Sequence, residues 1–173
     1  LPARGVAVDV CTGTGALAVA MGAARPGARV VATDVDPLAV ASARANGVEA
    51  YHGDLLAPVP AALPGRVDVV IGVVPYVPTG ALGLLPRDTL AYEPVLAYDG
   101  GPDGAAVLRR VVAGASSALR PGGALLLELG GHQADLLAPD LARHGFDGVT
   151  VLRDGDGDVR GVEATLRRPL IPA

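Results

Sequence analysis

Residues 7–15 read Ala-Val-Asp-Val-Cys-Thr-Gly-Thr-Gly, and this stretch decides the fold. A short apolar segment that carries Asp9 leads directly into a turn with Gly13 and Gly15, after which a helical pattern begins. Glycines at such a turn allow the backbone to approach a ligand closely at the N-terminus of a helix. The sequence therefore predicts a strand, a ligand-binding turn and a helix, in that order.

The carboxylate of Asp9 distinguishes between two kinds of ligand at this turn. A carboxylate would repel a pyrophosphate but would attract a ligand with a cationic end, such as the methionine portion of S-adenosylmethionine. We therefore interpret the turn as a methyl-donor site. The alternative is a dinucleotide site, because Gly13-x-Gly15-x-x-Ala18 fits a looser form of that fingerprint. Asp9 counts against this alternative.

Apolar segments of strand length alternate with helical periods along the rest of the chain. We predict strands at 5–10, 29–33, 48–51, 67–73, 124–129, 148–153 and 162–167. We predict helices at 15–24, at 37–46 after an Asp36 N-cap, at 103–119 with Asp103 as the cap, and at 132–144, where Pro139 should shorten or break the helix. Residues 76–102 are rich in proline and glycine and are predicted to form a long loop.

This alternation predicts a parallel sheet with helices on both faces and with ligands at the carboxyl ends of the strands. Three acids lie where the first three strands end, namely Asp9, Asp34 and Asp54. Asp34 follows the glycine turn by about 20 residues, the spacing at which an acid commonly binds ribose hydroxyls. Asp54 is placed to accept from an adenine amino group. Each acid alone could be an ordinary strand-end or capping residue, but the three together indicate a nucleoside-containing ligand.

Composition limits the other classes of function. The net charge of −4 argues against a broad nucleic-acid-binding face, and we interpret the doublets Arg109-Arg110 and Arg167-Arg168 as solvated charges. A single cysteine, Cys11, excludes an internal disulfide and a cysteine-based zinc site. No segment approaches the length of a membrane span, and no secretory signal is visible. We therefore expect one domain over residues 1–173, monomeric and cytoplasmic, with no metal.

Several motifs, from the glycine turn to the end of the chain, agree in order and spacing with those of one known family. They are Asp9-Val-Cys-Thr-Gly-Thr-Gly15, Ala32-Thr-Asp-Val-Asp-Pro37, Val73-Val74-Pro75-Tyr76, Glu93-Pro with Gly100-Gly-Pro-Asp-Gly104, Pro121-Gly-Gly with Glu128-Leu-Gly130 and Gln133, and the closing hairpin Arg153 to Arg160. Because it carries these motifs in this order and spacing, the chain resembles the HemK/PrmC-like protein-(glutamine-N5) methyltransferases. The family's N-terminal helical domain has no counterpart among these residues.

The resemblance implies a Rossmann-like class I methyltransferase fold, with a seven-stranded, mostly parallel sheet whose last strand is antiparallel. It implies S-adenosylmethionine as donor, S-adenosylhomocysteine as product, and N5-methylation of a protein glutamine, for example in a peptide-chain release factor. Cys11 would be a small residue beside the donor rather than a catalytic thiol. The implied catalytic residues are Val73, Val74, Pro75 and Tyr76. The implied donor-binding residues are Asp9, Cys11, Thr12, Gly13, Thr14, Gly15, Asp34, Val35, Asp54 and Leu55.

The sequence departs from the family at the chemical centre. The family has Asn-Pro-Pro-Tyr, in which the asparagine side chain and the next carbonyl hold the accepting amide, whereas Val73 offers no acceptor. A buried amide left half-paired costs roughly 1–3 kcal/mol. Val73 could simply complete a buried strand, the acceptor could be one that needs no side-chain clamp, or Tyr92 or Glu93 could compensate.

Two further classes of function stay open beside transfer to glutamine. The first is a degenerate family member that binds S-adenosylmethionine and has lost transfer or changed its acceptor. The second is an NAD(P)-dependent oxidoreductase, which would need an acid or base that handles hydride near the fourth strand. The apolar pair Val73-Val74 offers no such group.

Overall fold

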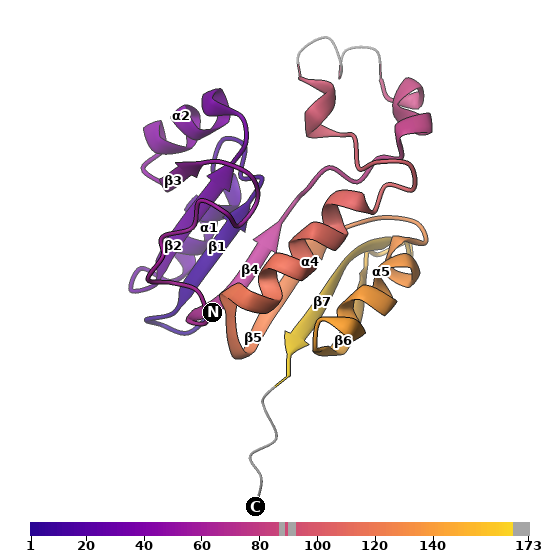
Figure 1. The fold of residues 1–173 in the computed structure, drawn as a ribbon. Coiled ribbons are helices and arrows are strands. Elements are labelled where there is room, and N and C mark those ends of the chain that lie inside the picture. The colour runs from indigo at the N-terminus through magenta and orange to yellow at the C-terminus, as the bar shows by residue number, and fades with distance from the viewer. Residues whose placement is uncertain (87–88, 90–92, 168–173) are drawn as a thin grey trace, which may run out of the picture.

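The computed structural model describes residues 1–86, 89 and 93–167, and Figure 1 shows one twisted sheet flanked by helices. The strands are β1 (Val6–Val10), β2 (Arg29–Asp34), β3 (Glu49–His52), β4 (Val67–Gly72), β5 (Leu119–Glu128), β6 (Phe146–Arg153) and β7 (Val159–Leu166). The helices are α1 (Ala16–Ala24), α2 (Pro37–Ala45), α4 (Ala106–Ala118) and α5 (Gln133–Arg143), with the short 3-10 helices η1 (Thr79–Leu84) and η2 (Val95–Ala97).

The sheet order is β3-β2-β1-β4-β5-β7-β6. Strands β1 to β5 pair in parallel, and β7 runs antiparallel to both β5 and β6. This confirms the predicted mostly parallel sheet with an antiparallel last strand. The chain adds β2 and then β3 on one side of β1, and it then crosses over to place β4 on the other side of β1. Ligands of open α/β sheets bind at such a reversal of strand order, beyond the carboxyl ends of the strands.

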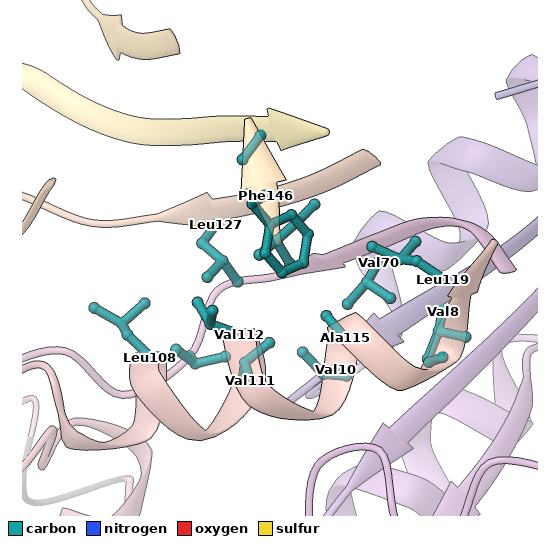
Figure 2. Packing of buried hydrophobic residues seen from close by; sticks show 14 of the residues in the cluster. Val8, Val10, Val70, Leu108, Val111, Val112, Ala115, Leu119, Leu127 and Phe146 are labelled. Carbon is teal, nitrogen blue, oxygen red and sulfur yellow. The ribbon is translucent and has the colours of Figure 1, made fainter. Parts of the chain in front are cut away.

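Helices cover both faces of the sheet, as predicted. On one face a large core joins α4 and α5 to the strands, and Figure 2 shows Leu108 and Val112 of α4 packing near Leu127 and Phe146. On the other face a smaller cluster of mainly alanine and valine side chains joins α1 and α2 to β2 and β3. Because neighbouring strand residues point to opposite faces, the β strands supply side chains to both cores.

Local signals fix several boundaries as expected. Asp36 is the N-cap of α2, and its side chain accepts a hydrogen bond from the Leu38 amide at 2.8 Å, with Pro37 at the first helical position. Residues 76–102 form a long connection, and its described part includes the short helices η1 and η2. Within the described residues, no helix is long and apolar enough to cross a membrane.

Two predictions about helices were wrong. Pro139 lies inside α5 without ending it. The proline is exposed while Leu137 and Leu141 are buried, so the lost backbone hydrogen bond lies on the solvent side and core packing retains the helix. Asp103 is not the N-cap of α4, which begins at Ala106; instead its carboxylate accepts from the Ala105 amide at 3.0 Å.

Candidate functional site

The glycine turn, residues 11–15, connects β1 to α1 at the carboxyl edge of the sheet. Both of its glycines have left-handed backbone angles, with φ of 57° at Gly13 and 86° at Gly15. A Cβ on Gly15 would lie 2.9 Å from the Val48 side chain and 3.2 Å from Ala43 Cβ, whereas a Cβ on Gly13 would meet nothing within 4 Å. Gly15 therefore serves the packing of α1, and Gly13 leaves the backbone open to a ligand.

Asp9 presents an unsatisfied carboxylate oxygen beside this turn. Its side chain is buried, with 1% exposure, and Oδ2 accepts a hydrogen bond from the Thr12 hydroxyl at 2.6 Å. Oδ1 is buried and has no partner in the described structure. Burial raises the pKa of Asp9 to about 6, while the hydrogen bond from Thr12 opposes this shift and the charge of Asp34 adds to it. A buried carboxylate oxygen without a partner fits a cationic ligand group.

Asp34 fixes the turn from the end of β2. One of its carboxylate oxygens accepts a hydrogen bond from the Gly13 amide and the other accepts from the Asp36 amide, both at 2.9 Å. A carboxylate can accept further hydrogen bonds beyond these two. The position predicted to bind ribose therefore also orders the backbone over which the ligand would lie.

The structure brings the three predicted acids together around Cys11. Burial and the negative charges of Asp34, Asp9 and Asp54 raise the pKa of the Cys11 thiol to about 12. This thiol therefore stays protonated at neutral pH, which agrees with its interpretation as a small, unreactive residue. A site with several carboxylates attracts cations and repels phosphates.

Asp54 also forms an ion pair with Arg110 of α4. The exposed Arg110 fits the interpretation of the doublet Arg109-Arg110 as solvated charge on a helix, although both arginines also form ion pairs. Arg109 contacts Asp103 at 2.7 Å and the buried Asp140 at 3.3 Å, so both arginines connect α4 to neighbouring segments. The arginine beside Asp54 lies 56 residues away in the chain, and no local pattern indicates that contact.

Other positions predicted to bind the donor lie at the same edge of the sheet. Cys11 and Leu55 have positive φ angles of 55° and 47°, a conformation that non-glycine residues rarely adopt and that is common at functional sites. The Val35 side chain is exposed, and its carbonyl lies 3.0 Å from His52 Nε2. No sequence pattern indicates the role of Asn46, whose side-chain amide donates to the Thr14 carbonyl at 2.9 Å and so connects the end of α2 to the glycine turn.

The turn that is predicted to hold the methyl acceptor, residues 73–76, follows β4 directly and is called the acceptor turn below. Val73 lies outside the strand and is 44% exposed, so the interpretation that it completes a buried strand was wrong. Val74 is buried, with 2% exposure. Among the described residues, the Val74 carbonyl accepts no hydrogen bond, which leaves it free for an N–H donor. The Tyr76 hydroxyl donates to Glu128 at 2.8 Å, and burial together with this carboxylate raises the Tyr76 pKa.

Of the two residues considered as compensation for Val73, Tyr92 lies outside the described residues. Glu93 is exposed and takes part in a side-chain hydrogen bond with Tyr98, which raises the pKa of that tyrosine. This contact suits a carboxylate that anchors its own loop. Within the described part of the chain, no group of three or more histidine, cysteine or acidic side chains could hold a metal ion.

The strand order, the antiparallel β7 and the glycine turn after β1 define a Rossmann-like class I methyltransferase fold. Residues 1–73 match the family described as Methyltransferase small domain. Within that class the chain is similar in sequence to release factor glutamine methyltransferases, which confirms the resemblance to the HemK/PrmC-like family. It is 41% identical over 174 residues to the release factor glutamine methyltransferase of Mycolicibacterium smegmatis, covering 95% of this chain and 60% of the relative.

Other relatives agree with this assignment. The release factor glutamine methyltransferase of Cereibacter sphaeroides is 39% identical over 163 residues, covering 92% of this chain and 59% of the relative. The chain therefore spans about 60% of the length of these curated relatives. Among solved structures, the chain is similar to the Mtq2-Trm112 complex of E. cuniculi, which is responsible for the methylation of the eRF1 translation termination factor. The TM-score is 0.61 at 25% sequence identity, and the match covers 95% of this chain and 86% of that chain.

Proposed function

We propose that this chain transfers a methyl group from S-adenosylmethionine to the side-chain amide nitrogen of a protein glutamine. The observation that carries the proposal is the buried, unpartnered Oδ1 of Asp9 beside the open backbone of Gly13. This pair suits a ligand that brings a cationic group close to a glycine-rich backbone. The same carboxylate disfavours the pyrophosphate of a nicotinamide dinucleotide.

The donor would be held by the residues at the ends of β1, β2 and β3. Asp9 would bind its cationic end, Asp34 its ribose, and Asp54 with the backbone of Leu55 its adenine. S-adenosylmethionine supplies an already activated methyl group on a sulfonium. The protein therefore has mainly to hold the accepting nitrogen in line with that methyl group and to exclude water.

The acceptor turn supplies part of this alignment. The free carbonyl of Val74 can accept one N–H of a planar amide, and the fixed ring of Tyr76 can form a wall of the site. Val73 leaves the second N–H without a partner, which costs roughly 1–3 kcal/mol in a buried site. We therefore expect transfer to glutamine to be slower than an intact asparagine clamp would allow, by roughly tenfold or more.

Binding of the donor without transfer is a second candidate function. The exposed, apolar Val73 side chain favours it, because it stands where an amide needs a hydrogen-bond acceptor. This candidate shares the donor site with the first and differs only in turnover. An oxidoreductase is less compatible, since neither Val73 nor Val74 can accept or donate a proton near the end of β4.

A peptide-chain release factor is the acceptor protein that we propose. Two relatives are named for that substrate, and the E. cuniculi complex methylates a termination factor. A relative from Burkholderia pseudomallei, 33% identical over 177 residues and covering 93% of this chain and 55% of the relative, is named a ribosomal protein uL3 glutamine methyltransferase. Both names connect glutamine methylation with translation, so we propose that the chain acts on a protein of the translation machinery. We also propose that it does so in the cytoplasm and as a monomer.

The test is a transfer assay with labelled S-adenosylmethionine and a purified bacterial release factor, followed by peptide mapping by mass spectrometry. The proposal predicts one added methyl group on a glutamine side chain. Donor binding by calorimetry without any transferred label would overturn transfer and establish the second candidate. Label on another residue type would instead contradict the glutamine acceptor while leaving the methyltransferase class in place.

A further inference from the structure

The side chain of Gln133, the first residue of α5, joins three separate segments. It is 5% exposed. Its Nε2 donates to the Tyr76 carbonyl at 2.6 Å and to the Gly104 carbonyl at 3.1 Å, and its Oε1 accepts from the Gly130 amide at 3.0 Å. The acceptor turn, the loop before α4 and the β5–α5 connection therefore meet at one buried amide.

A glutamine satisfies all three partners, and few other residues could. The site needs two N–H donors toward carbonyl oxygens and one acceptor toward an N–H, which is the arrangement of a primary amide. Glutamate would lack both donors, and methionine would lack all three functions. A buried polar group that loses its partners is costly, so the identity of this side chain matters more than its size.

The backbone around this amide is packed too closely to move independently. A Cβ on Gly104 would lie 2.4 Å from the Tyr76 carbonyl oxygen and 2.6 Å from Gln133 Nε2, and a Cβ on Gly100 would lie 2.7 Å from Tyr76 Cα. The Val77 amide donates to the Tyr98 carbonyl at 2.9 Å, and the Gly100 amide donates to the Val77 carbonyl at 2.8 Å. Residues 76–79 and 98–104 thus form one docked unit.

This unit determines the position of the proposed acceptor groups. The Tyr76 carbonyl is held by Gln133, and the Tyr76 hydroxyl is held by Glu128, so the residue is fixed at both ends. Val74 lies two residues upstream on the same short turn, between this anchored residue and the end of β4. A shift of the Tyr76 backbone would move the Val74 carbonyl with it. In-line transfer is sensitive to displacements of this kind.

We propose that Gln133 is a positioning residue for the methyl acceptor: its amide locks the acceptor turn to the 98–104 loop and so sets the place of the Val74 carbonyl and the Tyr76 ring. This inference rests on the proposed function of the turn. It concerns the acceptor side alone, because the proposed donor residues lie at the ends of β1, β2 and β3, on the other side of β4 from β5.

Two variants and one control test the proposal. Gln133→Met keeps the length of the side chain and removes every hydrogen bond. Gln133→Glu removes both donors when ionised but regains one O–H donor toward the Tyr76 carbonyl when protonated. His132→Ala is the matched control, since His132 is the exposed neighbour and its side chain makes no capping hydrogen bond to α5. Each protein is compared in donor titration, in transfer to a release factor, and in amide exchange followed by NMR.

For Gln133→Met we expect a fall in kcat of roughly 10- to 100-fold with little change in donor affinity. Amide exchange at Val77, Thr79 and Gly100 should be at least about tenfold faster, because these amides bond across the docked unit. Gln133→Glu should recover part of its kcat as pH falls, while Gln133→Met should not. The control should match wild type in every measurement.

Unchanged exchange at these three amides in Gln133→Met would overturn the proposal, even if the chain transferred no methyl group. Faster exchange with an unchanged kcat would overturn it as well, because the turn would then move without consequence for the acceptor. A wild-type chain without turnover would contradict the proposed transfer, and the exchange result would still decide whether Gln133 fixes the turn. Weaker donor binding in step with the loss of kcat would indicate general unfolding and contradict a positioning role.

Discussion

Replacing Asp9 with asparagine should stabilise the folded chain at neutral pH and weaken donor binding in the same variant. The pKa of Asp9 is raised from 3.8 to about 6, mainly by burial. At about 1.4 kcal/mol per pKa unit, the ionised carboxylate costs the folded state up to about 3 kcal/mol. Asparagine carries no charge and keeps an oxygen that can accept from the Thr12 hydroxyl, so Asp9→Asn should recover roughly 1–3 kcal/mol above pH 7.

The effect has a defined pH dependence. A carboxyl group whose pKa is raised in the folded state binds its proton more tightly there than in the unfolded chain. Its penalty is therefore absent below about pH 4, grows as pH rises, and is complete once pH passes the folded-state pKa of about 6. The stabilisation by Asp9→Asn should accordingly appear between about pH 4 and pH 7 and vanish in more acidic solution.

The assay is urea unfolding of both proteins from pH 4 to pH 8, with calorimetric titration of S-adenosylmethionine at pH 8. Loss of a charged hydrogen bond to the donor should weaken its binding roughly 10- to 100-fold. Asp156→Asn, at an exposed position in the β6–β7 hairpin, is the control for net charge and should change stability by less than about 0.5 kcal/mol. An Asp9→Asn protein that is less stable than wild type at pH 8, or that binds the donor equally well, would refute the reasoning.

Four further substitutions test the site and its surroundings. Val73→Asn should raise the rate of glutamine methylation by at least about tenfold in the transfer assay, and no gain would contradict the clamp argument. In thermal melts and calorimetry, Gly15→Ala should cost roughly 2 kcal/mol or more because its Cβ would meet Val48 and Ala43. Gly13→Ala should cost only about 1 kcal/mol yet weaken donor binding, and identical effects at the two glycines would exclude separate roles. Thr33→Val should leave stability unchanged or raise it by about 1 kcal/mol in urea, since the Thr33 hydroxyl is buried without a described partner; a clear loss would reveal a partner.

Features encoded over a few neighbouring residues could be predicted from the sequence. The glycine turn after β1, the Asp36 N-cap and the acids at the strand ends each depend on adjacent residues, and the structure places all of them at one edge of the sheet. The helical spacing of Leu108, Val111, Val112 and Ala115 likewise predicts the buried face of α4. Short-range patterns were sufficient here because the β/α alternation itself restricts the topology.

Features that depend on contacts between distant segments could not be predicted. β4 ends at Gly72, where a Cβ would lie 2.6 Å from the Val10 side chain, and no local pattern indicates that Val73 lies outside the strand. The ion pair of Arg110 with Asp54 and the hydrogen bond of Gln133 to Tyr76 join residues 56 and 57 positions apart. The motif that contains Gln133 indicates a family, but only the structure shows which carbonyl groups its side chain binds.

Calorimetric titration of the chain with S-adenosylmethionine and, separately, with NAD tests the central claim most directly. The buried Asp9 carboxylate, the open Gly13 backbone and the three clustered acids predict binding of S-adenosylmethionine and no binding of NAD. Binding of NAD alone would contradict the proposed function and leave only the fold in place.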